Sequence, residues 1–295
     1  MAKSERRVIS SRTVPDYRTR RLLPSRDQGH DPPPLYAPAV ADAPPCDPAL
    51  LDRAVAIARE AGASTLPWFR SVELEVEHKH DQTPVTEADR GAERLVRERL
   101  HEAFPDDAVI GEEEEPKPGT SGRTWVVDPI DGTKAFTHGV PLYSTLLAAA
   151  DEHGPLLGVI CLPALPETIW AGRGLGCFLE GERCHVSDHT TVDGAYLTAS
   201  ALRNWPAGAL DATHAAGAFV RTWGDAYGYA LVATGRVEAM VDHQAAVWDV
   251  APMPVIIGEA GGRFTDLAGA VSVTGGSGLA TNGVLHDELL ALLAP

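Results

Sequence analysis

The most constraining feature of the sequence is an apolar run that leads directly into two carboxylates. Residues 125–127 (Trp-Val-Val) have the composition of a strand buried on both faces, and Asp128 and Asp131 follow before the turn-forming Gly132. Two like charges about 4 Å apart repel by roughly 4 kcal/mol at an effective dielectric constant of 20. Carboxylates packed at the edge of a core therefore need a counter-charge, and a divalent cation would turn their repulsion into coordination.

Three further acidic clusters each lie where a strand is predicted to end or a helix to begin. They are residues 79–89, residues 111–115 and Trp248-Asp249. Oxygen ligands without nearby His or Cys favour Mg²⁺ or Mn²⁺ over Zn²⁺. Mg²⁺ commonly shares its ligands with a substrate phosphate, and the backbone N–H groups after Gly132 could cradle that phosphate. The acidic clusters therefore indicate phosphoryl chemistry.

Composition and charge narrow the class of protein. The 295 residues allow one large domain or two packed halves, and 41 acidic against 25 basic residues leave a net charge of −16. This charge argues against a nucleic-acid binder and suits a cationic cofactor or substrate. With no apolar stretch of about 20 residues and no secretory signal, we expect a soluble cytoplasmic protein that binds no membrane. Its four cysteines form no C-x-x-C pair, so we expect reduced thiols.

The pattern along the chain predicts a leader and two α+β halves. Residues 1–45, with eight Lys or Arg residues and three acids in residues 1–30, are basic and then proline-rich, and we expect them to be disordered, as a dispensable extension or a transit peptide. Residues 46–190 and 191–295 are the expected halves. Predicted helices lie from residue 48, over 86–100, 225–234 and 250–260, and at the C-terminus. Predicted strands lie over 72–77, 124–127, 143–149, 156–161, 168–171, 196–199, 237–241, 263–265 and 278–281, those between 108 and 185 forming an antiparallel meander.

Taken together, the motifs resemble the inositol monophosphatase family of Mg²⁺-dependent, lithium-sensitive phosphatases. The resemblance rests on Lys79-x-Asp81-x-Thr-Pro-Val-Thr-x-Ala-Asp89, Gly111-Glu112-Glu113, Asp128-Pro-Ile-Asp131-Gly-Thr133 and Trp248-Asp249-x-Ala, with Glu259-Ala-Gly-Gly262 after them, and covers about residues 48–295. It implies an α+β fold, a layered α/β/α/β/α sandwich of the inositol monophosphatase/fructose-bisphosphatase type, usually assembled as a homodimer.

The resemblance also implies a role for each matching residue. The metal ligands for two or three Mg²⁺ ions, or for Mn²⁺, would be Glu112, Asp128, the carbonyl of Ile130, Asp131 and Asp249. Asp89 and Thr133 would orient and deprotonate the attacking water, with Glu112 near it, and the amides of Gly132 and Thr133 would hold the phosphate. Glu113, Lys79 and Asp81 would be auxiliary.

Simpler interpretations remain open for several of these residues. Asp89 follows Thr86 by three positions and could only close a helix capping box. Asp249 could only be the N-cap of the helix after it. For Glu114 and Glu115 a solvated acidic loop is the preferred interpretation.

Substrate choice is the least constrained inference. Within the family, Trp223-Gly224-Asp225-x-x-x-Tyr229 and Thr281-Asn282-Gly283-x-x-His286 resemble the histidinol-phosphate phosphatase branch. Asp225 and Asp242 could meet the cationic amine or imidazolium of that substrate, although Asp242 could equally accept from sugar hydroxyls and Asp225 could be a helix N-cap. Three functions remain: a histidinol-phosphate phosphatase of histidine biosynthesis, a phosphatase for an inositol, sugar or nucleoside monophosphate, and a catalytically silent metal- or phosphate-binding module.

Overall fold

The computed structural model describes residues 43–79 and 83–293. The chain divides into two units, residues 1–30 and 31–295, and all described residues belong to the second. Residues 1–42 of the predicted leader lie outside the described residues. The last residues of the predicted leader are bound to the folded part of the chain, because the Pro44 carbonyl accepts a hydrogen bond from Nε of Arg173 at 2.8 Å.

The first part of the described chain contains a seven-stranded sheet. Its strand order is β3-β4-β5-β6-β7-β8-β9, antiparallel from β4 onward, with β3 parallel to β4. The elements are α1 (Pro48–Thr65), β1 (Val76–His78), β2 (Pro84–Thr86), α2 (Glu87–Ala103), β3 (Ala108–Gly111), β4 (Thr124–Asp131), α3 (Thr133–Thr137), β5 (Ser144–Asp151), β6 (Gly154–Leu162), β7 (Glu167–Gly172), β8 (Gly176–Leu179) and β9 (Glu182–Arg183).

A five-stranded sheet of mixed direction follows, in the order β11-β10-β12-β14-β13. Its elements are β10 (Tyr196–Ala199), a short 3₁₀ turn (Leu202–Asn204), α4 (Ala209–Ala215), β11 (Phe219–Arg221), α5 (Asp225–Ala233), β12 (Ala239–Asp242), α6 (Val247–Val250), α7 (Met253–Glu259), β13 (Arg263–Thr265), β14 (Gly278–Thr281) and α8 (His286–Leu293).

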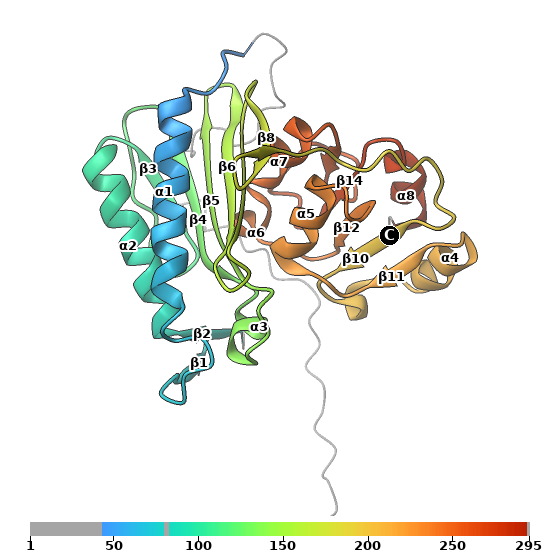
Figure 1. Cartoon of the computed structure of the whole chain (residues 1–295), viewed down its shortest axis with the longest axis horizontal. Coiled ribbons are helices and arrows are strands. Elements are labelled where there is room, and N and C mark those ends of the chain that lie inside the picture. Colours follow the sequence, from blue (N-terminus) through green and yellow to red (C-terminus); the bar gives the residue numbers. More distant parts are fainter. Residues whose placement is uncertain (1–42, 80–82, 294–295) are drawn as a thin grey trace, which may run out of the picture. The chain divides into compact units, whose positions relative to one another are not determined.

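Helices and sheets alternate in five layers (Figure 1). Helices α1 and α2 cover one face of the seven-stranded sheet, and α5 and α7 pack against its other face. Both α5 and α7 also contact the five-stranded sheet, whose far side carries α4 and α8. The α+β sandwich expected from the sequence is confirmed. Because α5, α6 and α7 lie between the two sheets, residues from both parts of the chain meet there.

Local sequence explains the two elements that matter most for this arrangement. Asp47 caps α1 by accepting from the backbone N–H of Ala49 at 2.9 Å, and Pro48 occupies the first turn. All eight residues of β4 are buried, including its two aspartates. An apolar strand buried on both faces thus places charged groups inside the fold.

Several predicted elements differ from the structure. The acidic alternation over 72–77 predicted a strand, but β1 covers only 76–78, and its three residues are exposed in a two-stranded ribbon with β2. The helix predicted over 250–260 is observed as α7, which begins only at Met253, and the separate short helix α6 ends at Val250, because Pro252 lacks the N–H that a continuous helix needs. The short elements β2, β3, α4, β8, β9 and β11 were not predicted.

Among residues 43–79 and 83–293, none of the helices has the length and hydropathy that crossing a membrane requires.

A buried histidine joins α8 to the five-stranded sheet. His286 is fully buried between Thr265 and Thr281, and each hydroxyl lies 3.0 Å from one ring nitrogen. Burial, together with the nearby Arg263 cation, lowers the pKa of His286 to about 4. Since an unfolded histidine titrates near pH 6.5, the unfolded chain binds the extra proton between these pH values.

The folded state should therefore lose stability as the pH falls through about 6.5 towards 4. From about pH 7.5 to about pH 5 we expect His286 to cost about 2 kcal/mol of the free energy of unfolding. Urea unfolding gives the free energy of unfolding of the wild type and of His286→Gln at each pH. The change with pH in the difference between these two free energies measures the contribution of His286. A difference that stays constant over this range would contradict the prediction.

Candidate active site

Three buried aspartates from distant stretches of sequence converge between the sheets. Asp128 and Asp131 lie at the end of β4, and Asp249 lies on α6, which packs against β4. One carboxylate oxygen from each lies within 4.8 Å of the other two. The structure thus brings together three of the carboxylates that the sequence suggested as metal ligands.

The protein holds these carboxylates in place without neutralising them. Asp131 accepts from the Ser144 hydroxyl at 3.0 Å and from the backbone N–H of Ala226 at 2.6 Å. Asp249 accepts from the backbone N–H of Ala246 at 2.7 Å. Among the described residues, the buried Oδ1 of Asp128 has no hydrogen-bond partner. All these partners are neutral, so the cluster keeps a deficit of positive charge.

The cost of burying these charges raises the pKa values of all three aspartates. Burial, reinforced by the neighbouring carboxylates, raises the pKa of Asp128 and of Asp131 well above the usual range. Burial likewise raises the pKa of Asp249 to about 8, with Glu112 adding to the effect. A set of carboxylate oxygens that crowds together, with one oxygen unpartnered, fits a hard divalent cation.

Asp249 is not the N-cap of its helix. It is the third residue of α6, whose N-cap is Ala246, and its side chain accepts from the Ala246 N–H. The second carboxylate oxygen remains available toward Asp128 and Asp131.

Glu112 lies at the rim of the cluster, in the loop that follows β3. The ammonium of Lys79 contacts Glu112 and Glu113, each at 2.7 Å. Burial alone would lower the pKa of Lys79, but the two carboxylates outweigh it and raise the pKa to about 12. Burial raises the pKa of Glu112, with the charge of Lys79 opposing the shift. Asp81 lies outside the described residues.

Asp89 and Thr133 form a second polar pair. Asp89 closes a capping box at the start of α2, where its Oδ2 accepts from the N–H and the hydroxyl of Thr86 at 2.8 and 2.6 Å. Its other oxygen, Oδ1, accepts from the Thr133 hydroxyl at 3.4 Å. Burial raises the pKa of Asp89. The capping role and the contact with Thr133 therefore coexist.

The turn after β4 is shaped by Gly132. Its φ of 79° lies in the left-handed region, and a Cβ there would come within 2.9 Å of the Asp225 carboxylate. The turn starts α3 at Thr133, whose hydroxyl also donates to the Ile130 carbonyl at 3.0 Å. It places the Gly132 and Thr133 amides beside the aspartates of β4.

Two more carboxylates come from the five-stranded sheet and α5. Asp242, at the end of β12, accepts from the Tyr229 hydroxyl at 3.1 Å and the Ser200 N–H at 3.4 Å, and burial raises its pKa to about 6. Asp225 is the first residue of α5 with a φ of 53°, and its N–H donates to the Ser200 hydroxyl at 2.8 Å. The N-cap of α5 is Gly224, so the simple N-cap interpretation of Asp225 does not hold.

Sequence reasoning missed the buried residue that shapes the acidic loop. Glu93 of α2 is fully buried, accepts from the N–H groups of Glu113 and Glu114 at 2.8 and 3.2 Å, and pairs with Arg97 at 2.8 Å. A Cβ on Gly111 would lie 2.0 Å from the Glu93 carboxylate, so only glycine fits there. Glu93 follows Asp89 by one helical turn, which was the available signal.

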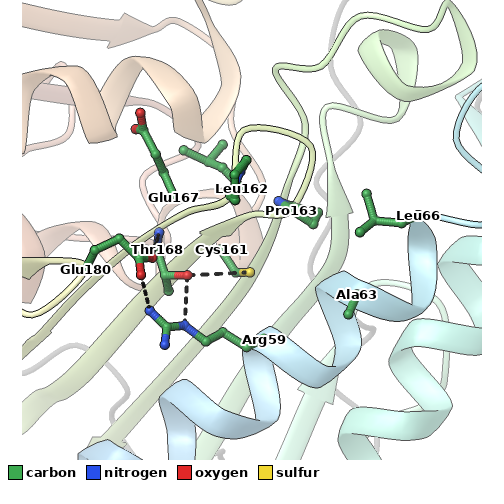
Figure 2. A pocket seen from close by; sticks show the side chains of 10 residues that line it. Arg59, Ala63, Leu66, Cys161, Leu162, Pro163, Glu167, Thr168 and Glu180 are labelled. Atoms are coloured by element: carbon green, nitrogen blue, oxygen red, sulfur yellow. Dashed lines mark hydrogen bonds and ion pairs between the residues drawn. The ribbon is translucent and has the colours of Figure 1, made fainter.

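A separate cavity of about 240 Å³ lies where α1 meets the seven-stranded sheet (Figure 2). Arg59 lines it and donates to Thr168 and Glu180 at 3.1 and 2.8 Å, and Cys161 lies beside them. None of its lining residues belongs to the predicted site.

The family model described as "Inositol monophosphatase family" matches residues 49–294. A histidinol-phosphatase of Mycobacterium tuberculosis is 41% identical over 253 residues, which span 81% of this chain and 96% of that protein.

Solved structures agree with this match. The extragenic suppressor protein suhB of Bartonella henselae has a TM-score of 0.76 at 29% identity, over 83% of this chain and 98% of its own. The Thermotoga maritima IMPase has a TM-score of 0.75 at 31% identity, and the match covers 83% of this chain and 96% of that chain. By sequence and by structure, this chain belongs to the inositol monophosphatase family.

Proposed function

We propose that this protein is a Mg²⁺-dependent phosphatase that hydrolyses histidinol phosphate to histidinol and phosphate. Its assignment as a phosphoric monoester hydrolase follows from the family. The observation that carries the proposal is the convergence of Asp128, Asp131 and Asp249 beside the Asp89–Thr133 pair. The name of the relative that is 41% identical supports the choice of substrate.

The metal ligands would be oxygen atoms at the ends of β3 and β4 and on α6. We assign them to Glu112, Asp128, the Ile130 carbonyl, Asp131 and Asp249, enough for two or three Mg²⁺ ions or for Mn²⁺. When bound, the cations supply positive charge that activates water and stabilises the phosphate oxygens in the transition state.

The chain's own residues orient and deprotonate the attacking water. Thr133 accepts the proton of the water at Oγ1 and passes its own proton to Oδ1 of Asp89, 3.4 Å away. Thr86 holds Oδ2 of Asp89, so the free oxygen stays directed at Thr133. A pKa raised by burial makes Asp89 a stronger base than an exposed aspartate. The Gly132 and Thr133 amides donate to the phosphate.

The carboxylates of Asp225 and Asp242 would bind the cationic end of the substrate. Histidinol phosphate carries an amine and an imidazole, and charged hydrogen bonds to carboxylates are roughly twice as strong as neutral ones. Asp225 lies beside Gly132, next to the proposed phosphate site. A short substrate could thus span the phosphate site and the two acids.

In its setting, the enzyme would act on a small-molecule monoester in the cytoplasm, as a step of histidine biosynthesis. We further propose that it is a homodimer. Neither nucleic acid nor membrane is a proposed partner.

Replacing Asp128 should separate metal binding from folding. In EDTA at about pH 8.5, Asp128→Asn should be more stable than the wild type by about 1–3 kcal/mol, because one repelling charge is removed. It should also lose the Mg²⁺-induced rise in melting temperature, which differential scanning calorimetry measures. The exposed Asp188 supplies the control Asp188→Asn, which should keep that rise. An undiminished Mg²⁺ response in Asp128→Asn would contradict the ligand assignment.

Thr133 should matter for turnover more than for binding. Thr133→Val should lower kcat by about 10²–10⁴ with little change in KM, because the proton path to Asp89 is broken. Thr133→Ser, which keeps the hydroxyl, should recover most of the rate. Equal losses in the two variants would rule out the hydroxyl as proton carrier.

Substrate preference can be measured directly as kcat/KM. Histidinol phosphate should exceed inositol 1-phosphate and adenosine monophosphate by at least about tenfold, or about 1.4 kcal/mol of transition-state binding. Asp225→Asn should lower kcat/KM for histidinol phosphate by about tenfold or more and affect inositol 1-phosphate less; asparagine tolerates the positive φ found there. Equal values on all three substrates would favour a broader phosphatase. If every monoester tested remained intact while Mg²⁺ still bound, the protein would be a silent binding module.

A further inference from the structure

Two cysteines face each other at the edge of the seven-stranded sheet, away from the acidic cluster. Cys177 lies on β8, and Cys184 directly follows β9. The two strands form a hairpin in which Phe178 pairs with Arg183, so the cysteines are the next opposed pair. The Cys184 N–H donates to the Cys177 carbonyl at 3.0 Å, which extends the ladder to this position.

The geometry allows a covalent bond between the two thiols. Their Sγ atoms are 3.5 Å apart, near enough for one thiol to donate to the other. Directly opposed residues of an antiparallel pair have Cα atoms about 5.5 Å apart, inside the range of about 4.4–6.8 Å that disulfides span. Side-chain rotation and a small backbone adjustment suffice to bring the sulfurs to bonding distance.

The two thiols differ in solvent access and acidity, as the peroxide-reactive cysteine and the resolving cysteine of a redox pair do. Cys177 is fully buried in the core between the sheets, whereas Cys184 is half-buried. The hydrogen bond between the two thiols lowers the pKa of Cys184, the Arg236 cation acts in the same direction, and burial opposes them. Burial raises the pKa of the other two thiols, Cys46 and Cys161, to about 11. Cys184 is thus the thiol that oxidants meet first.

We propose that Cys177 and Cys184 form a reversible disulfide when the protein meets hydrogen peroxide. The Cys184 thiolate attacks one peroxide oxygen, the O–O bond breaks, and hydroxide leaves a sulfenic acid on Cys184. The Cys177 sulfur then attacks that sulfur, the S–O bond breaks, and the proton of Cys177 leaves with the hydroxyl group as water. The hydroxide takes up the proton that Cys184 lost first. Two thiols and one peroxide yield one disulfide and two waters, and a dithiol reductant reverses the oxidation.

Peptide mapping of the full-length protein tests the proposal. Reduced protein is treated with hydrogen peroxide in its native state, denatured, alkylated and digested with trypsin, which cuts after Arg183 and so separates the two cysteines. We expect peptides 174–183 and 184–203 joined by a disulfide, with the intact chain lighter by two hydrogens and only Cys46 and Cys161 alkylated. Dithiothreitol should restore four alkylated thiols. The rate should not depend on protein concentration, because the bond is intramolecular.

Single variants separate a resolving role from mere proximity. In Cys177→Ala, Cys184 should go on to sulfinic acid, which dithiothreitol does not reverse. In Cys184→Ala, Cys177 should remain a thiol. Cys46→Ala should behave as the wild type. The proposal is overturned if peroxide leaves four alkylatable thiols in the wild type, if the bond involves Cys46 or Cys161, or if oxidation of Cys184 remains reversible in Cys177→Ala.

Discussion

Mutual repulsion among buried carboxylates is the constraint on which this structure depends. Asp128 and Asp131 enter the interior on a strand buried along its whole length, and Asp249 meets them from α6. Neutral hydrogen-bond donors fix the direction of the Asp131 and Asp249 carboxylates but supply no full positive charge. Bound cations would make this arrangement favourable, and in the proposed function its cost in stability is the cost of an active site prepared in advance.

Two cations of the chain lie at the rim of this cluster, beside the loop that carries Glu112. Lys79 contacts Glu112 and Glu113, two of the four glutamates in the loop of residues 112–115. Arg97 pairs with Glu93, whose carboxylate accepts hydrogen bonds from the backbone of the same loop. Both pairs fix the loop that carries Glu112. Among the described residues, neither of these cations pairs with Asp128, and Oδ1 of Asp128 has no hydrogen-bond partner. The centre of the cluster therefore remains suited to metal ions and a phosphate.

Much of this account could be predicted from sequence, and the limits have physical causes. Strands β13 and β14 match the predictions residue for residue, and the family resemblance is confirmed. The period-2 pattern over 72–77 was misleading because residues 72–75 form no strand and all three residues of β1 are exposed, so the apolar positions of the pattern build no buried face. Two features depend on long-range contacts that no local pattern encodes. They are the parallel pairing of β3 with β4 and the packing of the Glu93 carboxylate against Gly111. The convergence of Asp249 with Asp131 was inferred from the family resemblance, but the distance between their carboxylates could be obtained only from the folded structure.

The most direct measurement of the central claim is anomalous diffraction from crystals of the protein grown with Mn²⁺. The account predicts a strong anomalous peak in contact with Asp128, Asp131 and Asp249. It also predicts that this peak is lost in Asp128→Asn crystals that diffract equally well. Clear density for all three carboxylates with no Mn²⁺ between them at saturating metal would contradict it.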